Sequence, residues 1–331
     1  MKSLLVFVFM ILSYISFAQY AIVIHGGAGT ITKKNITTEK EAAINQALSE
    51  AIQIGVDLLE NGAEAIVVVE KVVIFMENSP LFNAGKGAVF NNEGRQEMDA
   101  CIMDGRDLST GAVAGVHNLK NPIFGARLVK DSTRHILLSG KRAEDFCLEK
   151  GAEYADSSYF FVQRRWDYFQ RVLERERNGN KDGGAAYEDE GTKKYGTVGC
   201  AVLDKFGNLA VATSTGGLTN KKYGRIGDTP IVGAGTYADN NTCAISCTGT
   251  GEFFIRGTIA RDISARMEFK GESLEKAGKE TLKKLDKMKG DGGFIGVDKD
   301  GNVIMMFNTE GMYRGYQTHE MDTSIVKIYG D

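Results

Sequence analysis

Two hairpin signals in the second half of the chain constrain its fold most strongly. They are residues 204–208, Asp-Lys-Phe-Gly-Asn, and residues 298–302, Asp-Lys-Asp-Gly-Asn. Each places a Gly-containing turn between two apolar runs, the pattern typical of a β-hairpin. Two such hairpins in one chain indicate two stacked antiparallel sheets.

Helical patterns precede and separate these hairpins. Thr38 and Glu41 suggest a capping box that opens a helix, and Gly62 fits its end. Residues 63–77 favour a second helix, although Val67-Val68-Val69 leaves a strand open. Further helices are predicted over 122–129, 141–150, 166–177, 253–269 and 273–288, and strands over 20–25, 98–103, 111–116 and 198–203. This order predicts an α/β sandwich with its sheets inside.

The bulk composition excludes two classes of partner. The 331 residues, 43% of them hydrophobic, are enough for a sizeable core. Lys and Arg (40) nearly balance Asp and Glu (43), which gives a net charge of −3. We therefore expect no nucleic acid and no membrane as partner.

The N-terminus predicts export. Lys2 precedes an apolar run from Leu4 to Leu12 that is too short to span a bilayer, and Ser16-Phe17-Ala18 has the form of a cleavage site. We interpret residues 1–18 as a signal peptide, so that the mature chain begins near Gln19 in the periplasm or outside the cell. The alternative is a buried N-terminal helix, but that would show polar residues on one side.

Metal and disulfide patterns are weak. Five cysteines, at positions 101, 147, 200, 243 and 247, could form at most two bridges, and no C-x-x-C is present. We expect mostly buried, inert thiols. The four histidines are scattered and form no H-E-x-x-H motif, so a transition-metal site is not expected.

The pair Gly196-Thr197 stands where a chain could cut itself. It lies between a polar, charged linker, residues 178–194, and the predicted strand 198–203. Cleavage there would give Thr197 a free α-amine beside its own hydroxyl, the base and nucleophile of covalent catalysis. The pKa of such an amine is about 7.7–8.0, which suits a base at neutral pH. A second hydroxyl cluster, residues 213–217, follows.

Three more segments carry candidate site residues. Arg225 and Asp228 could hold the two charged ends of an amino acid, but taken alone a surface ion pair is the simpler interpretation. Residues 246–252, Ser-Cys-Thr-Gly-Thr-Gly-Glu, could form an oxyanion hole or only a tight strand-to-helix turn. Asn83 could orient a substrate, although a turn is the safer interpretation.

Together these segments resemble the plant-type L-asparaginase/isoaspartyl peptidase family, which are N-terminal-nucleophile hydrolases made as inactive precursors. The resemblance covers essentially the whole mature chain. The segments that carry it are residues 24–29, 81–87, 98–105, 196–199, 213–217, 224–228, 246–252 and 307–314.

The resemblance implies a four-layer αββα sandwich that cuts itself between Gly196 and Thr197. One domain would then consist of an α chain, residues 19–196, and a β chain, residues 197–331, and two such αβ units would form a homodimer. Thr197 would be the nucleophile, assisted by Thr215. The remaining implied roles are a substrate clamp of Arg225 and Asp228, an oxyanion hole of Thr248 and Gly249 (Gly249 also contacting substrate), and a substrate contact at Asn83.

The resemblance also implies one ion and a substrate class. No cofactor is expected for catalysis, but a structural sodium ion would be held by the backbone carbonyls of Met76, Glu77, Ser79, Phe82, Ala84 and Lys86. The expected substrates are isoaspartyl (β-aspartyl) dipeptides and L-asparagine. Glycosylasparaginase is an alternative, but its nucleophile usually follows Asp, whereas Gly196 precedes Thr197 here. A more distant alternative is a secreted small-molecule binding protein that never cleaves itself.

Overall fold

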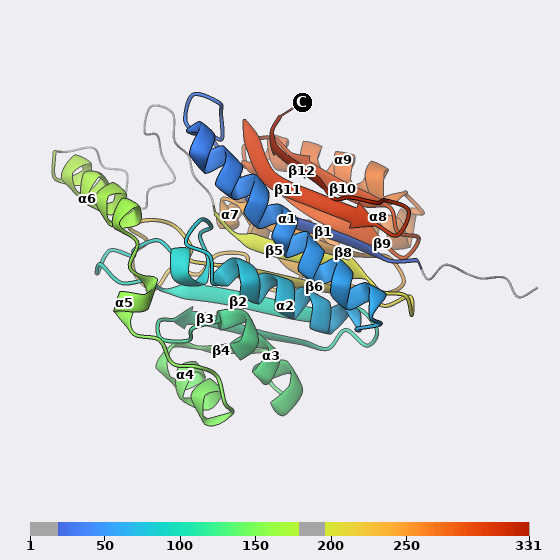
Figure 1. Ribbon diagram of the computed structural model, residues 1–331, viewed down its shortest axis with the longest axis horizontal. Coiled ribbons are helices and arrows are strands. Elements are labelled where there is room, and N and C mark those ends of the chain that lie inside the picture. Colours follow the sequence, from blue (N-terminus) through green and yellow to red (C-terminus); the bar gives the residue numbers. More distant parts are fainter. Residues whose placement is uncertain (1–18, 179–195, 331) are drawn as a thin grey trace, which may run out of the picture.

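The computed structural model describes residues 19–178 and 196–330, which form two stacked β-sheets between layers of helices (Figure 1). The large sheet has the strand order β12-β11-β1-β5-β6-β2-β3-β4, and the small sheet has the order β10-β9-β8-β7. The strands are β1 (Ala21–Gly29), β2 (Met98–Asp104), β3 (Thr110–Val116), β4 (Leu137–Ser139), β5 (Val198–Leu203), β6 (Leu209–Thr215), β7 (Thr236–Ala238), β8 (Cys243–Gly249), β9 (Gly292–Asp298), β10 (Val303–Phe307), β11 (Gly311–Thr318) and β12 (Ile325–Tyr329).

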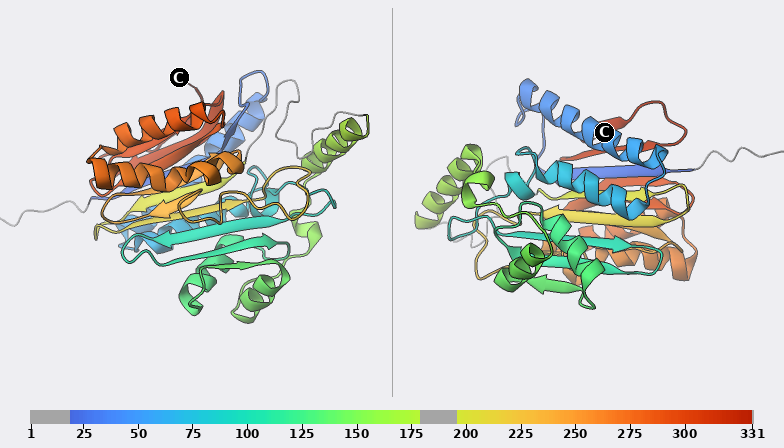
Figure 2. Two further views of the ribbon diagram at one scale, coloured as in Figure 1. Left: turned by 180° about the vertical axis from the view of Figure 1, so that it is seen from behind. Right: turned by 60° about the horizontal axis from the view of Figure 1, so that its bottom comes forward.

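Helices cover the two outer faces of this pair of sheets. The helices are α1 (Thr38–Glu60), α2 (Ala65–Glu77), α3 (Pro122–Ser132), α4 (Gly140–Glu149), α5 (Ser157–Phe160), α6 (Gln163–Arg177), α7 (Gly251–Gly257), α8 (Ile259–Lys270) and α9 (Leu274–Lys287), with a 3₁₀ turn at Gly85–Gly87. Helices α1, α2 and α3 pack on the large sheet, and α8 and α9 pack on the small one (Figure 2). The predicted αββα sandwich is confirmed.

Alternating side chains separate two hydrophobic cores. Along β1, Ile22 and Ile24 belong to the core under α1 and α2, whereas Ala21 and Val23 belong to the core between the sheets. This alternation is expected of a strand that is buried on both faces. The central strands of the large sheet are therefore fixed from both sides, and their ends are rigid supports for a site.

Both predicted hairpins are confirmed. Residues 204–208 connect β5 to β6 in the large sheet, and residues 298–302 connect β9 to β10 in the small sheet. The segment of residues 63–77, for which the sequence also allows a strand, forms helix α2. Val68, Val69, Val72 and Val73 of this helix are buried in the core, and the apolar contact they gain outweighs the low helix propensity of β-branched residues.

Three local predictions were wrong. The first helix is capped by Thr37, whose side chain accepts a hydrogen bond from the Lys40 amide, so Thr38 and Glu41 form no capping box. The helix expected over 253–269 is two helices, because Thr258 has a left-handed φ of 46°. The large sheet is not wholly antiparallel, since β4 pairs parallel to β3 after the α3 crossover.

All five cysteines are free and buried, so the structure contains no disulfide among the residues it describes. Burial raises the pKa of the Cys101 thiol to about 12, which keeps it protonated and inert. No helix in the described ranges is long and apolar enough to cross a membrane. The predicted signal peptide and nearly all of the predicted linker lie outside the described residues.

Candidate active site

The two threonines singled out in the sequence meet at one end of the large sheet. Thr197 immediately precedes β5, and Thr215 is the last residue of β6. The two strands are antiparallel neighbours, with Val198 opposite Ser214. The start of one strand therefore lies beside the end of the other, which brings together residues that are far apart in the sequence. Both threonines are almost completely buried.

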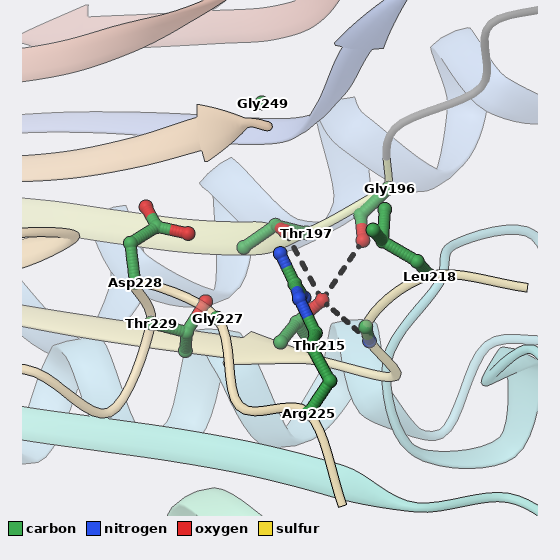
Figure 3. A pocket seen from close by; sticks show the side chains of 10 residues that line it. Gly196, Thr197, Thr215, Leu218, Arg225, Gly227, Asp228, Thr229 and Gly249 are labelled. Carbon is green, nitrogen blue, oxygen red and sulfur yellow. Dashed lines mark hydrogen bonds between the residues drawn. The ribbon is translucent and has the colours of Figure 1, made fainter. Parts of the chain in front are cut away.

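Three hydrogen bonds converge on the Thr215 hydroxyl (Figure 3). The Thr197 hydroxyl donates to Thr215 Oγ1 at 3.1 Å, and the Gly217 amide donates to it at 3.0 Å. Thr215 in turn donates its own proton to the Gly196 carbonyl oxygen at 3.0 Å. Because a hydroxyl has a single proton, these partners fix its direction. In the uncut chain, Thr215 therefore polarises the Gly196 carbonyl, which belongs to the peptide bond between Gly196 and Thr197.

Asn83 lies beside this group but holds its surroundings in place. Its amide donates to the Gly217 carbonyl at 2.8 Å, and its Oδ1 accepts from the Val89 amide at 2.9 Å. A Cβ built at Gly196 would approach Asn83 Cβ to 2.3 Å, so only glycine fits there. Both ends of the amide are engaged with backbone groups, so Asn83 ties its own loop to the segment that follows Thr215.

Arg225 and Asp228 lie together on the loop between β6 and β7. A Cβ built at Gly251 would fall 2.8 Å from Asp228 Oδ1 and 3.0 Å from Arg225 Nη2. The two side chains therefore share one small space that the missing side chain of Gly251 leaves open. A guanidinium and a carboxylate that line one space are complementary to the two charged ends of an α-amino acid.

Asp228 is buried without a hydrogen-bond partner for one oxygen. Its exposure is 6%, and Oδ2 has no donor among the described residues. Burial raises the pKa of Asp228 to about 7, and the nearby Arg225 opposes that rise. A buried carboxylate oxygen without a donor is costly unless a ligand supplies one, and an ammonium group would do so.

Glu252 is the partner of Arg225 that sequence reasoning missed. Its two oxygens accept from Arg225 Nε and Nη2, both at 2.8 Å. Glu252 stands in the first turn of α7, where acidic residues are common for reasons of helix stability. Its sequence position therefore gave no signal of this contact.

Thr248 and Gly249 end strand β8 opposite the threonine pair. Thr248 is 1% exposed, and its hydroxyl has no hydrogen-bond partner among the described residues. Gly249 has a φ of +157°, and a Cβ there would lie 2.4 Å from the Asp291 carbonyl. Gly249 lines the pocket, whereas Thr248 lies directly behind it in the strand.

One pocket gathers most of these groups (Figure 3). Its lining residues are Gly196, Thr197, Thr215, Gly217, Leu218, Arg225, Gly227, Asp228, Thr229 and Gly249. Leu218 and Thr229 were not predicted, because nothing in their sequence context distinguishes them from loop residues. A hydroxyl, a cation and a carboxylate at one pocket can hold a zwitterionic amino acid and attack its side chain.

The loop proposed for sodium has backbone carbonyls close to its glycines. A Cβ at Gly85 would lie 2.4 Å from the Glu77 carbonyl oxygen, and one at Gly87 would lie 1.9 Å from that of Phe82. Such glycines leave room for carbonyl groups, which are suitable ligands for a hard cation. The Lys86 ammonium lies over the Tyr159 ring, 5.3 Å from its centroid. Two of the six carbonyls proposed to hold sodium, those of Glu77 and Phe82, therefore lie against these glycines.

Comparisons with known proteins show which family the chain resembles over nearly its whole length. A family model described as "Asparaginase" matches residues 18–327. An isoaspartyl peptidase of Salmonella typhimurium is 46% identical over 309 residues, which cover 93% of this chain and 98% of the relative. Its counterpart from Escherichia coli is 44% identical over 94% of this chain and 97% of its own. An isoaspartyl peptidase/L-asparaginase of Rattus norvegicus is 39% identical over 88% and 84%, respectively.

Proposed function

The chain belongs to the asparaginase family, and we propose that it is a threonine-nucleophile hydrolase of isoaspartyl dipeptides and L-asparagine. One observation carries this proposal: Thr197, Thr215 and the Gly196 carbonyl are joined by hydrogen bonds at the edge of a pocket that also contains Arg225 and Asp228. Relatives that are isoaspartyl peptidases support this branch over glycosylasparaginase.

The first step of the proposal is maturation. Thr197 Oγ attacks the Gly196 carbonyl carbon while Thr215 donates a hydrogen bond to the carbonyl oxygen. The Gly196–Thr197 C–N bond then breaks, the nitrogen takes the proton that the hydroxyl loses, and an ester joins Gly196 to Thr197 Oγ. Water hydrolyses this ester, which leaves a carboxylate on Gly196 and a free α-amine on Thr197. The products are an α chain ending at Gly196 and a β chain beginning at Thr197.

The second step is turnover. Arg225 binds the substrate α-carboxylate, and Asp228 binds its α-ammonium. Thr197 Oγ attacks the side-chain carbonyl, its α-amine accepts the hydroxyl proton, and that proton passes to the leaving amine. Thr248 and Gly249 would donate to the oxyanion. Water then cleaves the β-aspartyl ester, which releases aspartate and regenerates the Thr197 hydroxyl.

Activity of the purified protein tests the proposal. We expect wild type to release aspartate from an isoaspartyl dipeptide and ammonia from L-asparagine. Thr197→Ala should do neither, because the nucleophile is absent. Release of aspartate from N-glycosylated asparagine alone would favour glycosylasparaginase. Binding of L-aspartate without hydrolysis of any of these compounds would favour the binding protein.

Three further features belong to the proposal. We infer a sodium ion on the carbonyls of residues 76–86, which would stiffen the loop behind Asn83. A higher melting temperature in sodium chloride than in choline chloride would support this ion.

We infer export with removal of residues 1–18, so that the secreted protein should begin at Gln19. We also infer a homodimer of αβ units, which sedimentation would test.

A further inference from the structure

The Arg225 guanidinium is held on one side before any ligand binds. Arginine presents two edges that can each bind a carboxylate with two hydrogen bonds: the side edge, Nε and Nη2, and the terminal edge, Nη1 and Nη2. Glu252 occupies the side edge with two bonds of 2.8 Å. The terminal edge is left for a second carboxylate.

Two glycines leave room for the guanidinium. A Cβ at Gly227 would lie 2.9 Å from Arg225 Nη1, and a Cβ at Gly251 would lie 3.0 Å from Nη2. Both terminal nitrogens therefore pass close to backbone that carries no side chain. The two glycines leave the space, and Glu252 supplies the directional contact that selects one orientation within it.

We propose that Glu252 is a positioning residue that holds the Arg225 fork by its side edge and reserves the terminal edge for the substrate α-carboxylate. This inference rests on the proposed function, because it assigns Arg225 to a substrate carboxylate. Glu252 itself touches no substrate: it is absent from the pocket lining and its side chain is half exposed. Its contact with Arg225 lowers the pKa of Glu252, so the pair stays ionised at neutral pH.

The position of Glu252 in the chain links the clamp to the rest of the site. Glu252 follows the strand end that carries Thr248 and Gly249 by only three residues. One short segment therefore supplies the proposed oxyanion donors and the group that orients Arg225. A shift of this segment would move the oxyanion donors and Glu252 together. The distance between the bound substrate carboxylate and the reacting carbonyl would therefore be kept.

A different role for Glu252 makes the opposite prediction. If its carboxylate were a stand-in that the substrate must displace, its removal would strengthen substrate binding. If it orients Arg225, its removal frees a long side chain whose ordering the substrate must then supply, and binding weakens. The sign of the change in affinity therefore distinguishes the two roles.

The test compares Glu252→Ala, Glu252→Gln and Glu252→Asp with wild type. With an isoaspartyl dipeptide, we expect the KM of Glu252→Ala and Glu252→Gln to rise about tenfold, the equivalent of one charge-assisted hydrogen bond. Their kcat should stay within about threefold, because an interaction equal in ground and transition states changes KM alone. Glu252→Asp retains the charge and should recover part of the loss.

Two controls separate this role from general damage. Glu268→Gln breaks another Arg–Glu pair, with Arg261 on α8, and should leave KM unchanged. All Glu252 variants should still cut themselves, because Glu252 contacts neither Gly196 nor Thr197 in the uncut chain. If Glu252→Ala fails to fold, the nearly isosteric Glu252→Gln decides the question.

Binding of L-aspartate, measured by calorimetry, gives a readout that needs no turnover. The dissociation constant should rise about tenfold in Glu252→Gln, in parallel with KM. If the dissociation constant of Glu252→Gln is unchanged or lower while the wild type is active, the role of Glu252 is overturned and the proposed function stays intact. Wild type that neither hydrolyses the dipeptide nor binds L-aspartate would overturn both.

Discussion

At the scale of the residue, the Thr215 hydroxyl has the most constrained position in the site. It accepts from Thr197 and Gly217 and donates to the Gly196 carbonyl, so each of its hydrogen-bonding capacities is used. A hydroxyl is needed for this combination, since an apolar side chain of the same shape could neither accept nor donate.

The corresponding prediction concerns Thr215→Val. Loss of the donor to the Gly196 carbonyl should slow self-cleavage on the order of 100-fold, the usual cost of removing one oxyanion donor. Thr215→Ser retains the hydroxyl and should cut at a rate within about tenfold of wild type. Appearance of the β chain with time, followed by gel electrophoresis, measures both rates. Cleavage of Thr215→Val at the wild-type rate would remove Thr215 from the mechanism.

A second residue-scale prediction concerns Asp228. Burial raises its pKa to about 7, and only the ionised form attracts a substrate ammonium. The affinity for L-aspartate should therefore increase as pH rises from about 5.5 towards 7 and level off above it. Calorimetry across this range measures the effect. Asp228→Asn should bind more weakly and show no such rise, whereas a profile identical to that of wild type would assign the titration to another group.

At the scale of the element, helix α2 ends in a buried carboxyl group that contacts the strand carrying Thr215. Glu77 Oε1 accepts from the Ser214 hydroxyl at 2.6 Å and from the Ile123 amide at 3.0 Å. Its other oxygen has no partner among the described residues. Burial raises the pKa of Glu77 to about 8, so the folded protein keeps this group protonated at neutral pH.

This contact gives a prediction about stability. Between the ordinary carboxyl pKa of about 4.5 and about 8, the unfolded chain releases the Glu77 proton while the folded chain keeps it. The wild-type free energy of unfolding should therefore fall by about 1.4 kcal/mol for each pH unit in this window, relative to Glu77→Gln. Glu77→Gln mimics the protonated form and should melt higher at pH 8 but not at pH 4.5. A constant difference across this range would place the titration elsewhere.

At the same scale, the elements differ in how far the sequence predicts them. The hairpins at 204–208 and 298–302 are determined by local turn chemistry, and both formed as predicted. The break between α7 and α8 depends on one left-handed residue, Thr258, which no propensity favours there. The short edge strand β4 pairs with β3 because helix α3 brings the chain back beside it. The residues of β4 themselves therefore give little indication of a strand.

At the scale of the whole molecule, the stacked sheets explain why the site combines distant segments. Thr197 immediately precedes β5, Thr215 ends β6, and Gly249 ends β8 in the other sheet. Motifs in the sequence indicated these residues individually. Their meeting is a property of strand order. The contact of Glu252 with Arg225 was not predicted, because a glutamate in the first turn of a helix is ordinary.

The most direct test of the central claim is the intact mass of the purified protein, with sequencing of each N-terminus. Self-cleavage predicts two chains, of which one consists of residues 197–331 and begins with Thr197. In Thr197→Ala the chain should remain whole. A wild-type chain that stays uncut while it hydrolyses isoaspartyl dipeptides would contradict the account, because Thr197 would then have no free α-amine to act as base.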